Sequence, residues 1–317
     1  MKILFGVPQG SVLGPLLFNL FIDDISKINC DGIILYADDG AFCVIDNNYD
    51  LLMSRVQLLV NNIAEWLSNN RLFPNTLKTY LMFFNYRNNS PPLPNIYFNS
   101  DILSWIDSFK YLGMIIDSKL SFKLHISYIN NKISRGVGAL NHLRYFCHKN
   151  ILLKIYHSLV YSHIIQNIVI WGGVSDNKVN CIQVSMNNAL RSILNVKFIN
   201  HVPNLSTNQI YLSLNIFKFR DLYKYFILKF IHSFLYGNHQ SIFYNYFLDL
   251  MPLHTYNTRH RNINLPNIRL EVEKSLTVYN SAKIINDFPE HLLTPQSTAT
   301  LKVRYKDFVM EKYNSLV

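Results

Sequence analysis

In the first 120 residues, short runs of apolar residues alternate with longer amphipathic stretches. Residues 14–25 are apolar nearly all round, with a proline in the first turn, which predicts a buried helix. Two β-branched and aromatic runs, 33–36 and 41–45, flank the turn residues 37–40, and this pattern predicts a hairpin with two acids at its tip. Apolar side chains at helical spacing over 50–70 predict an amphipathic helix that covers a sheet.

The following elements are predicted from weaker signals. Strands are expected at 80–85 and 111–116, and the prolines of 88–94 indicate a loop between them. Apolar residues at helical spacing predict a further helix over 126–143, which two glycines weaken.

From residue 151 onward the strand signals fade and helical periodicity dominates. Helices are predicted over 151–170, 179–196, 208–214 and 217–236. The segment 252–270 is predicted to be a basic loop before a last helical stretch; its basic residues are His254, Arg259, His260, Arg261 and Arg269. We therefore predict an α+β fold for residues 1 to about 120 and a mainly α fold beyond.

Charge changes this picture because it is unevenly spread. The 317 residues hold 30 Lys and Arg against 20 Asp and Glu, for a net charge of +10. Residues 1–50 carry 2 basic and 7 acidic side chains (net −5), so residues 51–317 carry 28 and 13 (net +15). This distribution suits a polyanionic partner, with a cation held in the acidic part, although basic proteins without a nucleic-acid partner are also common. Size and apolar content exclude a disordered tail, a collagen and a small disulfide scaffold.

Cysteine and hydropathy patterns bear on the compartment. The four cysteines, Cys30, Cys43, Cys147 and Cys181, form no C-x-x-C pair, so we expect buried thiols in a reducing compartment. Polar residues interrupt both long apolar stretches, 3–22 and 159–174, so neither a signal peptide nor a membrane span is predicted. The expected protein is soluble, nuclear or cytoplasmic, not secreted, and makes no contact with a membrane.

Several groups of residues are only weak candidates for a functional site, because they lack the partners that their chemistry would need. His142, Cys147 and His148 are close enough in sequence to suggest a metal site, but no second pair at ligand spacing completes it. Structural or surface roles are therefore favoured for them. Ser11 has no spaced His and Asp partners, so we interpret it as a turn or helix-start residue and not as a nucleophile. The basic patch at 259–261 is interpreted as an RNA contact or, equally, as a solvated loop. The abundance of Asn leaves single Asn residues little weight as helix caps.

The strongest candidate chemistry lies at the tip of the first hairpin. Asp38 and Asp39 supply adjacent hard oxygen ligands of the kind that Mg²⁺ takes together with water and substrate phosphates. An isolated Asp-Asp-Gly sequence is more often a solvated turn, so the interpretation depends on the surrounding motifs.

Those motifs resemble a known family. The sequence G-V-P-Q-G-S-V-L-G-P at 6–15, followed by L-Y-A-D-D at 35–39, closely resembles the G-x-P-Q-G-S and Y-A-D-D signature of reverse transcriptases. The flanking residues are similar to the LINE-type, non-LTR retrotransposon branch, in particular to jockey-like elements. Further blocks resemble the same branch: Asn75-x-x-Lys78-Thr79, Phe109 to Gly113, Trp171-Gly172, Gln183 with Ala189 to Arg191, and Tyr256 to Arg259. Group II intron maturases and telomerases share the hairpin acids but fit the other blocks less well.

The resemblance implies a fold and an activity. Residues 1–120 would form a partial right-hand polymerase palm, 121–150 a thumb-like helix, and 151–317 an α-rich C-terminal region of retrotransposon type. The implied enzyme is an RNA-directed DNA polymerase, a nucleotidyltransferase that uses two Mg²⁺ ions. Its partners would be an RNA template, a DNA primer and deoxynucleoside triphosphates, and no obligate protein partner is expected.

The resemblance also implies roles for individual residues. Asp38 would bind metal, with Asp39 as its neighbour at the same site. Tyr36 would pack under the nucleotide, and Lys78 would lie near its phosphates. The backbone of Pro8, Gln9 and Gly10 would come close enough to touch the templating base or the incoming nucleotide. The primer grip would be formed by Tyr111, Leu112 and Gly113.

One expected catalytic group of this family has no match. The family's first catalytic Asp lies on a strand before the G-x-P-Q-G block, whereas residues 1–22 contain no acid. Asp23 and Asp24, at the end of the predicted helix, are poor substitutes because acids there oppose the helix dipole. We therefore expect an N-terminally truncated copy with little or no activity alone. Two alternatives remain: a catalytically dead remnant that at most binds nucleic acid, and an α-rich interaction protein built on 151–317.

Overall fold

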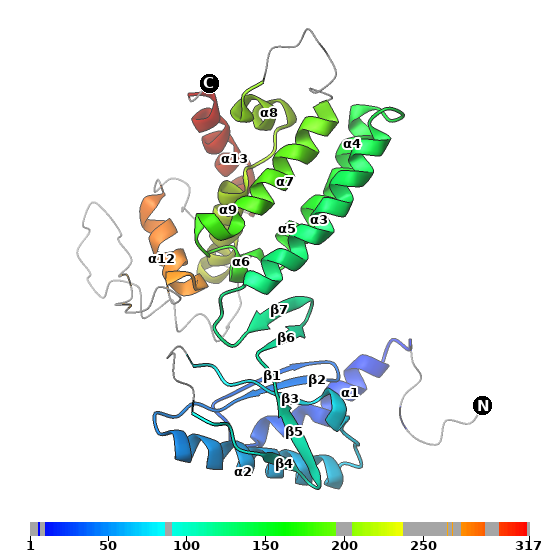
Figure 1. The fold of residues 1–317 in the computed structure, drawn as a ribbon, viewed down its shortest axis with the longest axis vertical. Helices are drawn as coiled ribbons and strands as arrows, with labels where there is room; N and C mark the ends of the chain where they lie inside the picture. Colours follow the sequence, from blue (N-terminus) through cyan, green and yellow to red (C-terminus); the bar gives the residue numbers. More distant parts are fainter. Residues whose placement is uncertain are drawn as a thin grey trace. The chain divides into compact units, whose positions relative to one another are not determined.

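A computed structural model describes residue 6 and residues 10–85, 91–194, 205–236, 265, 268, 274–288 and 298–315 (Figure 1). The chain divides into two units, residues 1–108 and 109–317. Strands are concentrated before residue 118 and helices after it, so the predicted combination of an α+β part and a mainly α part is confirmed at this level. The predicted finer division at about residues 120 and 150 stays a prediction.

The first unit contains two small sheets and two α-helices, of which α2 is the longer. Its elements are α1 (Gly14–Ile22), η1 (Asp23–Lys27), β1 (Gly32–Tyr36), β2 (Asp39–Cys43), α2 (Tyr49–Asn69), η2 (Thr76–Lys78), β3 (Tyr80–Leu81), β4 (Ile96–Phe98) and β5 (Asp101–Trp105). Strands β1 and β2 form one sheet, and the other has the order β3-β5-β4. In the second sheet β3 is parallel to β5, and β4 is antiparallel to it.

Helix α2 covers the three-stranded sheet, as its periodicity predicts. Val60 and Ala64 of the helix form one buried cluster with Ile96, Phe98 and Leu103 of β4 and β5. The helix begins after an N-cap, although the abundance of Asn had given single Asn residues little weight as caps. The Asn48 side chain accepts hydrogen bonds from the backbone N–H groups of residues 50 and 51. Strands β4 and β5 were not predicted, because each is too short to show a clear alternation.

The prediction that the first helix is buried is wrong. Of the residues of α1, only Gly14 and Ile22 are buried, while the large side chains of Leu16, Leu20 and Phe21 are 56%, 66% and 47% exposed. Among the described residues, no element covers this face of α1. The sequence pattern shows that the helix is apolar all round, but whether it is buried depends on which elements pack against it in the tertiary structure.

The second unit is mainly helical. Its elements are β6 (Ser108–Tyr111), β7 (Met114–Asp117), α3 (Lys123–Leu143), α4 (Lys149–Tyr156), the π-helix η3 (His157–Tyr161), α5 (Ser162–Ile165), α6 (Ile168–Trp171), α7 (Asp176–Leu194), α8 (Thr207–Leu214), α9 (Phe219–Tyr236), α12 (Thr277–Asp287) and α13 (Thr298–Asn314). The helix predicted over 151–170 is divided into four pieces, with a break at Gln166 and Asn167 before α6.

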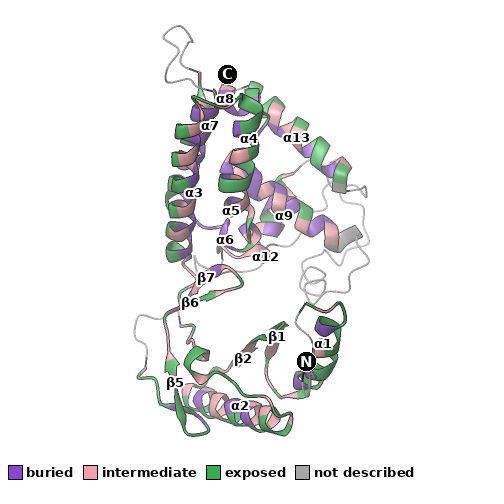
Figure 2. Cartoon of the chain, turned by 90° about the vertical axis from the view of Figure 1, so that its right-hand side faces the viewer, coloured by how far each residue is buried: buried purple, intermediate pink, exposed green. Residues whose placement is uncertain are grey.

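One continuous core holds this unit together, and its centre is the packing of α3 against α7. Ile129, Ile133 and Leu140 of α3 are fully buried there with side chains of α7 (Figure 2). Two hydrogen bonds cross between the helices, from Ser185 to Asn130 (2.8 Å) and from Ser192 to Asn141 (2.5 Å). The predicted helix over 126–143 is therefore confirmed, with a buried and an exposed face.

The strand predicted at 111–116 is instead a hairpin. Strands β6 and β7 are joined by Leu112 and Gly113, which both have positive φ angles (46° and 83°). Positive φ at both central residues is the pattern of a type I′ turn, which matches the twist of the strands. The prediction failed because Leu112 gives no turn signal.

Three further expectations concern the surface. None of the four cysteines is buried: Cys43 and Cys181 are exposed and the other two are intermediate, so the buried-thiol expectation is wrong. The helices among the described residues include none that is long and apolar enough to cross a membrane. Most of the predicted basic loop at 252–270, including the patch at 259–261, lies outside the described residues.

Candidate functional site

The acidic pair lies at the end of a tight antiparallel hairpin. Tyr36 pairs with Asp39, and the ladder continues without a bulge to Gly32 opposite Cys43. The connection is therefore only Ala37 and Asp38, which is shorter than the four-residue turn that the sequence predicts. Asp38 sits in the turn and Asp39 begins β2, and both are exposed.

Ala37 has an unusual backbone conformation. Its φ is 51°, while Asp38 is not among the residues of positive φ. Positive φ at the first central residue alone is the pattern of a type II′ turn, a position that favours glycine. An L-residue there costs about 1–2 kcal/mol. The hairpin therefore holds its acidic tip in a strained form that the paired strands must stabilise.

One face of the hairpin combines aromatic and acidic side chains. Tyr36 and Asp39 are directly opposite each other, so their side chains lie on the same face of the ladder. Ile34 lies two residues before Tyr36 on that face, and these two side chains are 57% and 62% exposed. The hairpin thus presents an accessible apolar surface next to its carboxylates.

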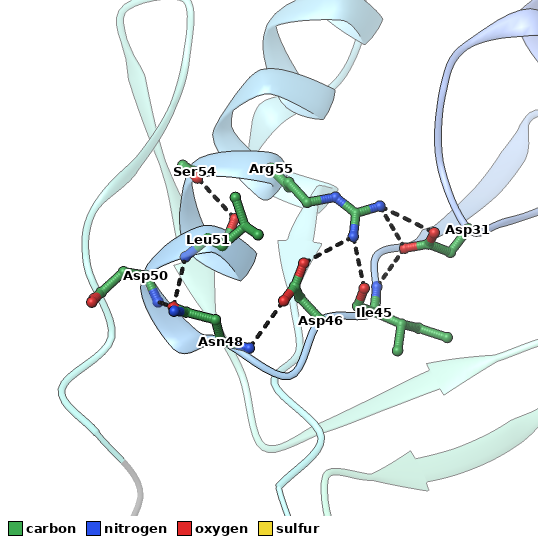
Figure 3. A network of polar contacts seen from close by, with 8 residues as sticks. All are labelled: Asp31, Ile45, Asp46, Asn48, Asp50, Leu51, Ser54 and Arg55. Carbon is green, nitrogen blue, oxygen red and sulfur yellow. Dashed lines mark hydrogen bonds and ion pairs between the residues drawn. The ribbon is translucent and has the colours of Figure 1, made fainter.

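Arg55 of α2 fastens the base of the hairpin (Figure 3). Its guanidinium forms two hydrogen bonds to Asp31, before β1, at 3.0 and 2.9 Å, and one to Asp46, after β2, at 3.2 Å. It also donates to the Ile45 carbonyl at 2.7 Å. The Ile45 N–H in turn donates to Asp31 at 2.6 Å. A single cation therefore joins both ends of the hairpin to the helix that covers the neighbouring sheet.

The acids at this base are held in their charged forms. The hydrogen bond from the Ile45 backbone N–H, and then the Arg55 guanidinium, lower the pKa of Asp31. The backbone N–H of Asn48 and then Arg55 lower the pKa of Asp46. Hydrogen bonds to both carboxylates raise the pKa of Arg55. These carboxylates are committed to the fold, so they are not available as metal ligands in this arrangement.

The tip itself suits a hard divalent cation. Asp38 and Asp39 offer exposed carboxylate oxygens, which are ligands that Mg²⁺ prefers. A protein usually supplies one or two carboxylates to a bound Mg²⁺ ion. No group of three or more His, Cys, Asp or Glu that could hold a metal occurs among the described residues. Asp24 accepts a hydrogen bond from the Trp66 indole at 3.1 Å, which gives it a structural partner on α2.

The glycine-rich block before α1 is partly described. Gly6 and Gly10 both have φ of +80°, a conformation that favours glycine, while Pro8 and Gln9 between them lie outside the described residues. The Ser11 hydroxyl accepts a hydrogen bond from the Gly14 N–H at 3.1 Å. The interpretation of Ser11 as a helix-start residue is therefore confirmed.

The remaining predicted site residues belong to other elements than the acidic hairpin. Lys78 is exposed at the end of η2 in the first unit, just before β3. Tyr111, Leu112 and Gly113 belong to the β6–β7 hairpin of the second unit. An added Cβ on Gly113 would collide with the Gln166 side-chain amide, so this turn packs closely against the end of α5. Roles for these residues stay predictions.

Two polar residues that orient this hairpin were missed by sequence reasoning. The Asp117 carboxylate ends β7 and accepts backbone hydrogen bonds from Ser121 (2.9 Å) and Phe122 (2.8 Å), which shape the entry to α3. His125 is fully buried, and its Nδ1 accepts the Ile115 N–H at 3.2 Å. Burial lowers the pKa of His125 to about 4, so the ring is neutral. Neither residue has a signal beyond its position near a turn.

The sequence around the hairpin is similar to that of known proteins. Residues 2–116 match the sequence model of reverse transcriptase (RNA-dependent DNA polymerase). A probable RNA-directed DNA polymerase from transposon BS of Drosophila melanogaster is 30% identical over 201 residues, which cover 59% of this chain and 22% of that protein. The RNA-directed DNA polymerase from mobile element jockey of the same species is 27% identical over 199 residues, with the same coverage.

Residues 2–116 are therefore similar to the reverse transcriptase family. A probable RNA-directed DNA polymerase from transposon X-element of Drosophila melanogaster is also similar, at 26% identity over 196 residues, 59% of this chain and 21% of that protein. The resemblance to retrotransposon enzymes is thus confirmed. The chain spans about a fifth of the length of these relatives. No solved structure matches it.

Some sequence blocks that resemble the reverse transcriptases of mobile elements are part of the packing. Trp171 is fully buried, and its indole N–H donates to the Gln166 carbonyl at 2.9 Å. The Gln183 side chain donates to the Tyr211 hydroxyl at 2.7 Å and accepts the Phe219 N–H at 2.9 Å, which joins α7, α8 and the start of α9. These residues therefore hold the second unit together. The block at 256–259 lies outside the described residues.

Proposed function

We propose that this chain is a part of an RNA-directed DNA polymerase and carries the hairpin carboxylates that bind the catalytic metal. The observation that supports this most directly is the exposed Asp38-Asp39 tip within the segment that matches the reverse transcriptase family. In this proposal residues 1–120 are a partial polymerase palm, 121–150 a thumb-like helix, and 151–317 an α-rich C-terminal region.

The proposed chemistry is nucleotidyl transfer. Bound Mg²⁺ would supply charge neutralisation of the triphosphate and activation of the primer 3′-hydroxyl. Asp38 is the proposed metal ligand, and Asp39 supports it from the first position of β2. The clamp of Arg55 on Asp31 and Asp46 keeps the hairpin in place beneath them. These two aspartates therefore act by holding a cation and not by moving a proton.

The other motif residues are proposed to hold the substrates. Tyr36 packs under the incoming nucleotide, on the same face as Asp39. The backbone from Pro8 to Gly10 contacts the templating base or that nucleotide, and Lys78 lies near its phosphates. In the second unit, the turn of Tyr111, Leu112 and Gly113 contacts the primer. The proposed partners are an RNA template, a DNA primer and deoxynucleoside triphosphates.

We further propose that the chain has little activity by itself. Two-metal phosphoryl transfer needs more carboxylate ligands than one hairpin tip offers, and residues 1–22 contain no acid. The alternative function, a catalytically dead protein that still binds nucleic acid, is favoured by the net charge of +15 over residues 51–317.

Primer extension on an RNA template separates these functions. The chain would be compared with Asp38→Asn and with Asp50→Asn, an exposed acid in the first turn of α2 that serves as the matched control. Weak incorporation that Asp38→Asn abolishes and Asp50→Asn preserves would support the polymerase. Equal incorporation by all three would contradict it. Template binding without incorporation in any of them would favour the catalytically dead alternative.

A further inference from the structure

A polar pocket lies within the second unit, where α7, α8, α9 and α13 come together (Figure 1). Its volume is about 400 Å³, which is in the range of small-molecule sites. The charged residues that line it are four cations, Lys218, Arg220, Lys224 and Lys312, and one acid, Asp221. None of them belongs to the motifs on which the proposed polymerase rests. Four positive charges against one negative charge leave the lining with a net charge of +3.

The acid in this pocket already has partners. Asp221 is buried, and one of its carboxylate oxygens accepts the Tyr313 hydroxyl at 2.5 Å. The other oxygen lies 3.5 Å from the Lys312 ammonium. The Tyr313 hydroxyl in turn accepts the Lys218 backbone N–H at 2.9 Å. Burial, and then the negative charge of Asp221, raise the pKa of Tyr313, so the phenol is neutral. The carboxylate is therefore committed to holding α9 against α13.

The guanidinium of Arg220 is committed to the fold in the same way. Its Nε donates to Asp176, and its two terminal nitrogens donate to the carbonyls of Gly172 at 2.8 Å and Val174 at 2.5 Å. Asp176 partly balances its charge. When Asp176 is counted as a second acid, four cations against two acids still leave a net charge of +2.

Two lysines of the pocket have no acidic partner. The Lys218 ammonium donates to the side-chain oxygen of Asn208, which is neutral. Among the described residues, neither Lys218 nor Lys224 forms an ion pair. Burial lowers the pKa of Lys218; the Asp221 carboxylate opposes this effect, and the Lys312 ammonium adds to it. A bound anion would therefore relieve the repulsion between these ammonium groups.

Neutral side chains add hydrogen-bond donors to the same pocket. The Asn187 side-chain oxygen accepts hydrogen bonds from the Gln183 amide and the Tyr211 hydroxyl, both at 2.8 Å, which fixes the orientation of its amide. In the part of the chain that the structure describes, no group accepts from the Asn187 NH₂. Thr207, the first residue of α8, brings a hydroxyl and the positive end of the helix dipole. The pocket thus offers free donors, while its carboxylate and amide oxygens are already used.

We propose that this pocket binds a small phosphorylated molecule. A phosphate group carries about two negative charges and three acceptor oxygens, so it matches the surplus charge and the free donors better than a single carboxylate does. Lys218 and Lys224 hold the phosphate, Asn187 and Thr207 donate to it, and the rest of the molecule fills the remaining volume. The site goes beyond the proposed polymerase, because all its residues lie in the second unit and none takes part in nucleotidyl transfer.

The test is isothermal titration calorimetry of the whole chain with sodium pyrophosphate, in EDTA and at constant salt. We expect binding at one site. Lys224→Gln should raise the Kd by about tenfold, because a hydrogen bond to a charged group is lost. Lys229→Gln makes the same change of charge at an exposed position of α9 outside the pocket. It is the matched control and should leave the Kd unchanged.

Asn187→Asp tests the donors with the shape of the side chain preserved. The new carboxylate keeps the oxygen that accepts from Gln183 and Tyr211, and it replaces the free NH₂ by a charged oxygen. Circular dichroism checks that the variant is folded. We expect it to lose pyrophosphate binding, whereas a residue that serves only the fold would leave the Kd unchanged.

Succinate and a DNA oligonucleotide are titrated in parallel. Absence of pyrophosphate binding by the wild type, an unchanged Kd in Lys224→Gln, equal weakening by Lys229→Gln, or succinate binding as tight as that of pyrophosphate would overturn the proposal. So would an oligonucleotide that displaces pyrophosphate and binds Lys224→Gln more weakly, because the pocket would then be part of a nucleic-acid surface. Since no metal or deoxynucleoside triphosphate is present, an inactive polymerase would not affect the result.

Discussion

The two units differ in how their apolar side chains are used. In the second unit, α3, α7 and their neighbours share one core, with Trp171, Ile133 and Met186 fully buried. The described core of the first unit is a small cluster under α2, while large apolar side chains of α1 and of the acidic hairpin are exposed. The segment that matches the reverse transcriptase family lies almost wholly in the first unit.

A segment with strong sequence motifs therefore need not be the segment with the largest buried core. The hairpin with Asp38 and Asp39 is the most recognisable part of the chain, yet the contact that ties its base to α2 is a hydrogen-bonded clamp at Arg55 near the surface. The second unit lies mostly beyond the family match, and its core contains no side chain of that hairpin. We therefore expect mutations to affect the two units separately.

The largest effect is expected for Trp171→Ala. Removing a fully buried indole destabilises a core by about 3–5 kcal/mol. Trp66 and Trp105, both in the first unit, remain as fluorophores. In urea, the helical circular dichroism should unfold at lower concentration while the fluorescence transition stays in place. Phe146→Ala, at a side chain that is 84% exposed, is the control with little effect. Equal shifts of both signals would show that the units unfold as one.

Acidification should also act on the second unit. Burial holds the pKa of His125 at about 4, below its usual value near 6.5, so the unfolded chain binds the proton more tightly. The stabilisation is complete above pH 6.5 and is lost as the pH falls towards 4, by about 3 kcal/mol. Urea unfolding followed by circular dichroism at pH 7, 5.5 and 4.5 measures this loss. His142→Gln, at an exposed position, should not alter it; a flat pH profile in the wild type would contradict the burial argument.

The two glycines of α3 offer a matched pair with opposite signs. Gly136→Ala places a Cβ against the Leu159 carbonyl and should destabilise the unit by about 1–3 kcal/mol. Gly138→Ala meets open space and should stabilise it by about 0.5–1 kcal/mol. Thermal unfolding of both variants measures the difference. Shifts in the same direction would mean that the helix backbone, and not the approach of η3, sets the cost.

A smaller and local effect is expected for Arg55→Met. The substitution removes the hydrogen bonds to Asp31 and Asp46, which lie near the surface, so global stability should change little. Amide hydrogen exchange at Ile45 and along β1 and β2 should become faster, with α3 unchanged. Because both acids have lowered pKa values, the wild type should approach the variant only as the pH falls below about 4. Identical exchange in wild type and variant at pH 7 would show that Arg55 does not hold the hairpin in place.

Sequence patterns predicted the elements that have a long period or a strong motif. Helices α2 and α3 follow from spacing alone, and the acidic hairpin follows from two apolar runs around a turn. What they missed depends on tertiary contacts. The exposure of α1, the clamp of Arg55 on acids at both ends of the hairpin, and the turn at Leu112 have no local signal. Asn48 is a true N-cap among many Asn residues that are not, and only the structure distinguishes it.

Binding of a divalent cation at the hairpin tip is tested most directly with Mn²⁺ as a paramagnetic probe in NMR spectra of the whole chain. We expect substoichiometric Mn²⁺ to broaden the amide signals of residues 36–40 first, and the double variant Asp38→Asn, Asp39→Asn to lose this broadening. Asp50→Asn should retain it. Broadening that begins elsewhere, or that persists at 36–40 in the double variant, would contradict the claim.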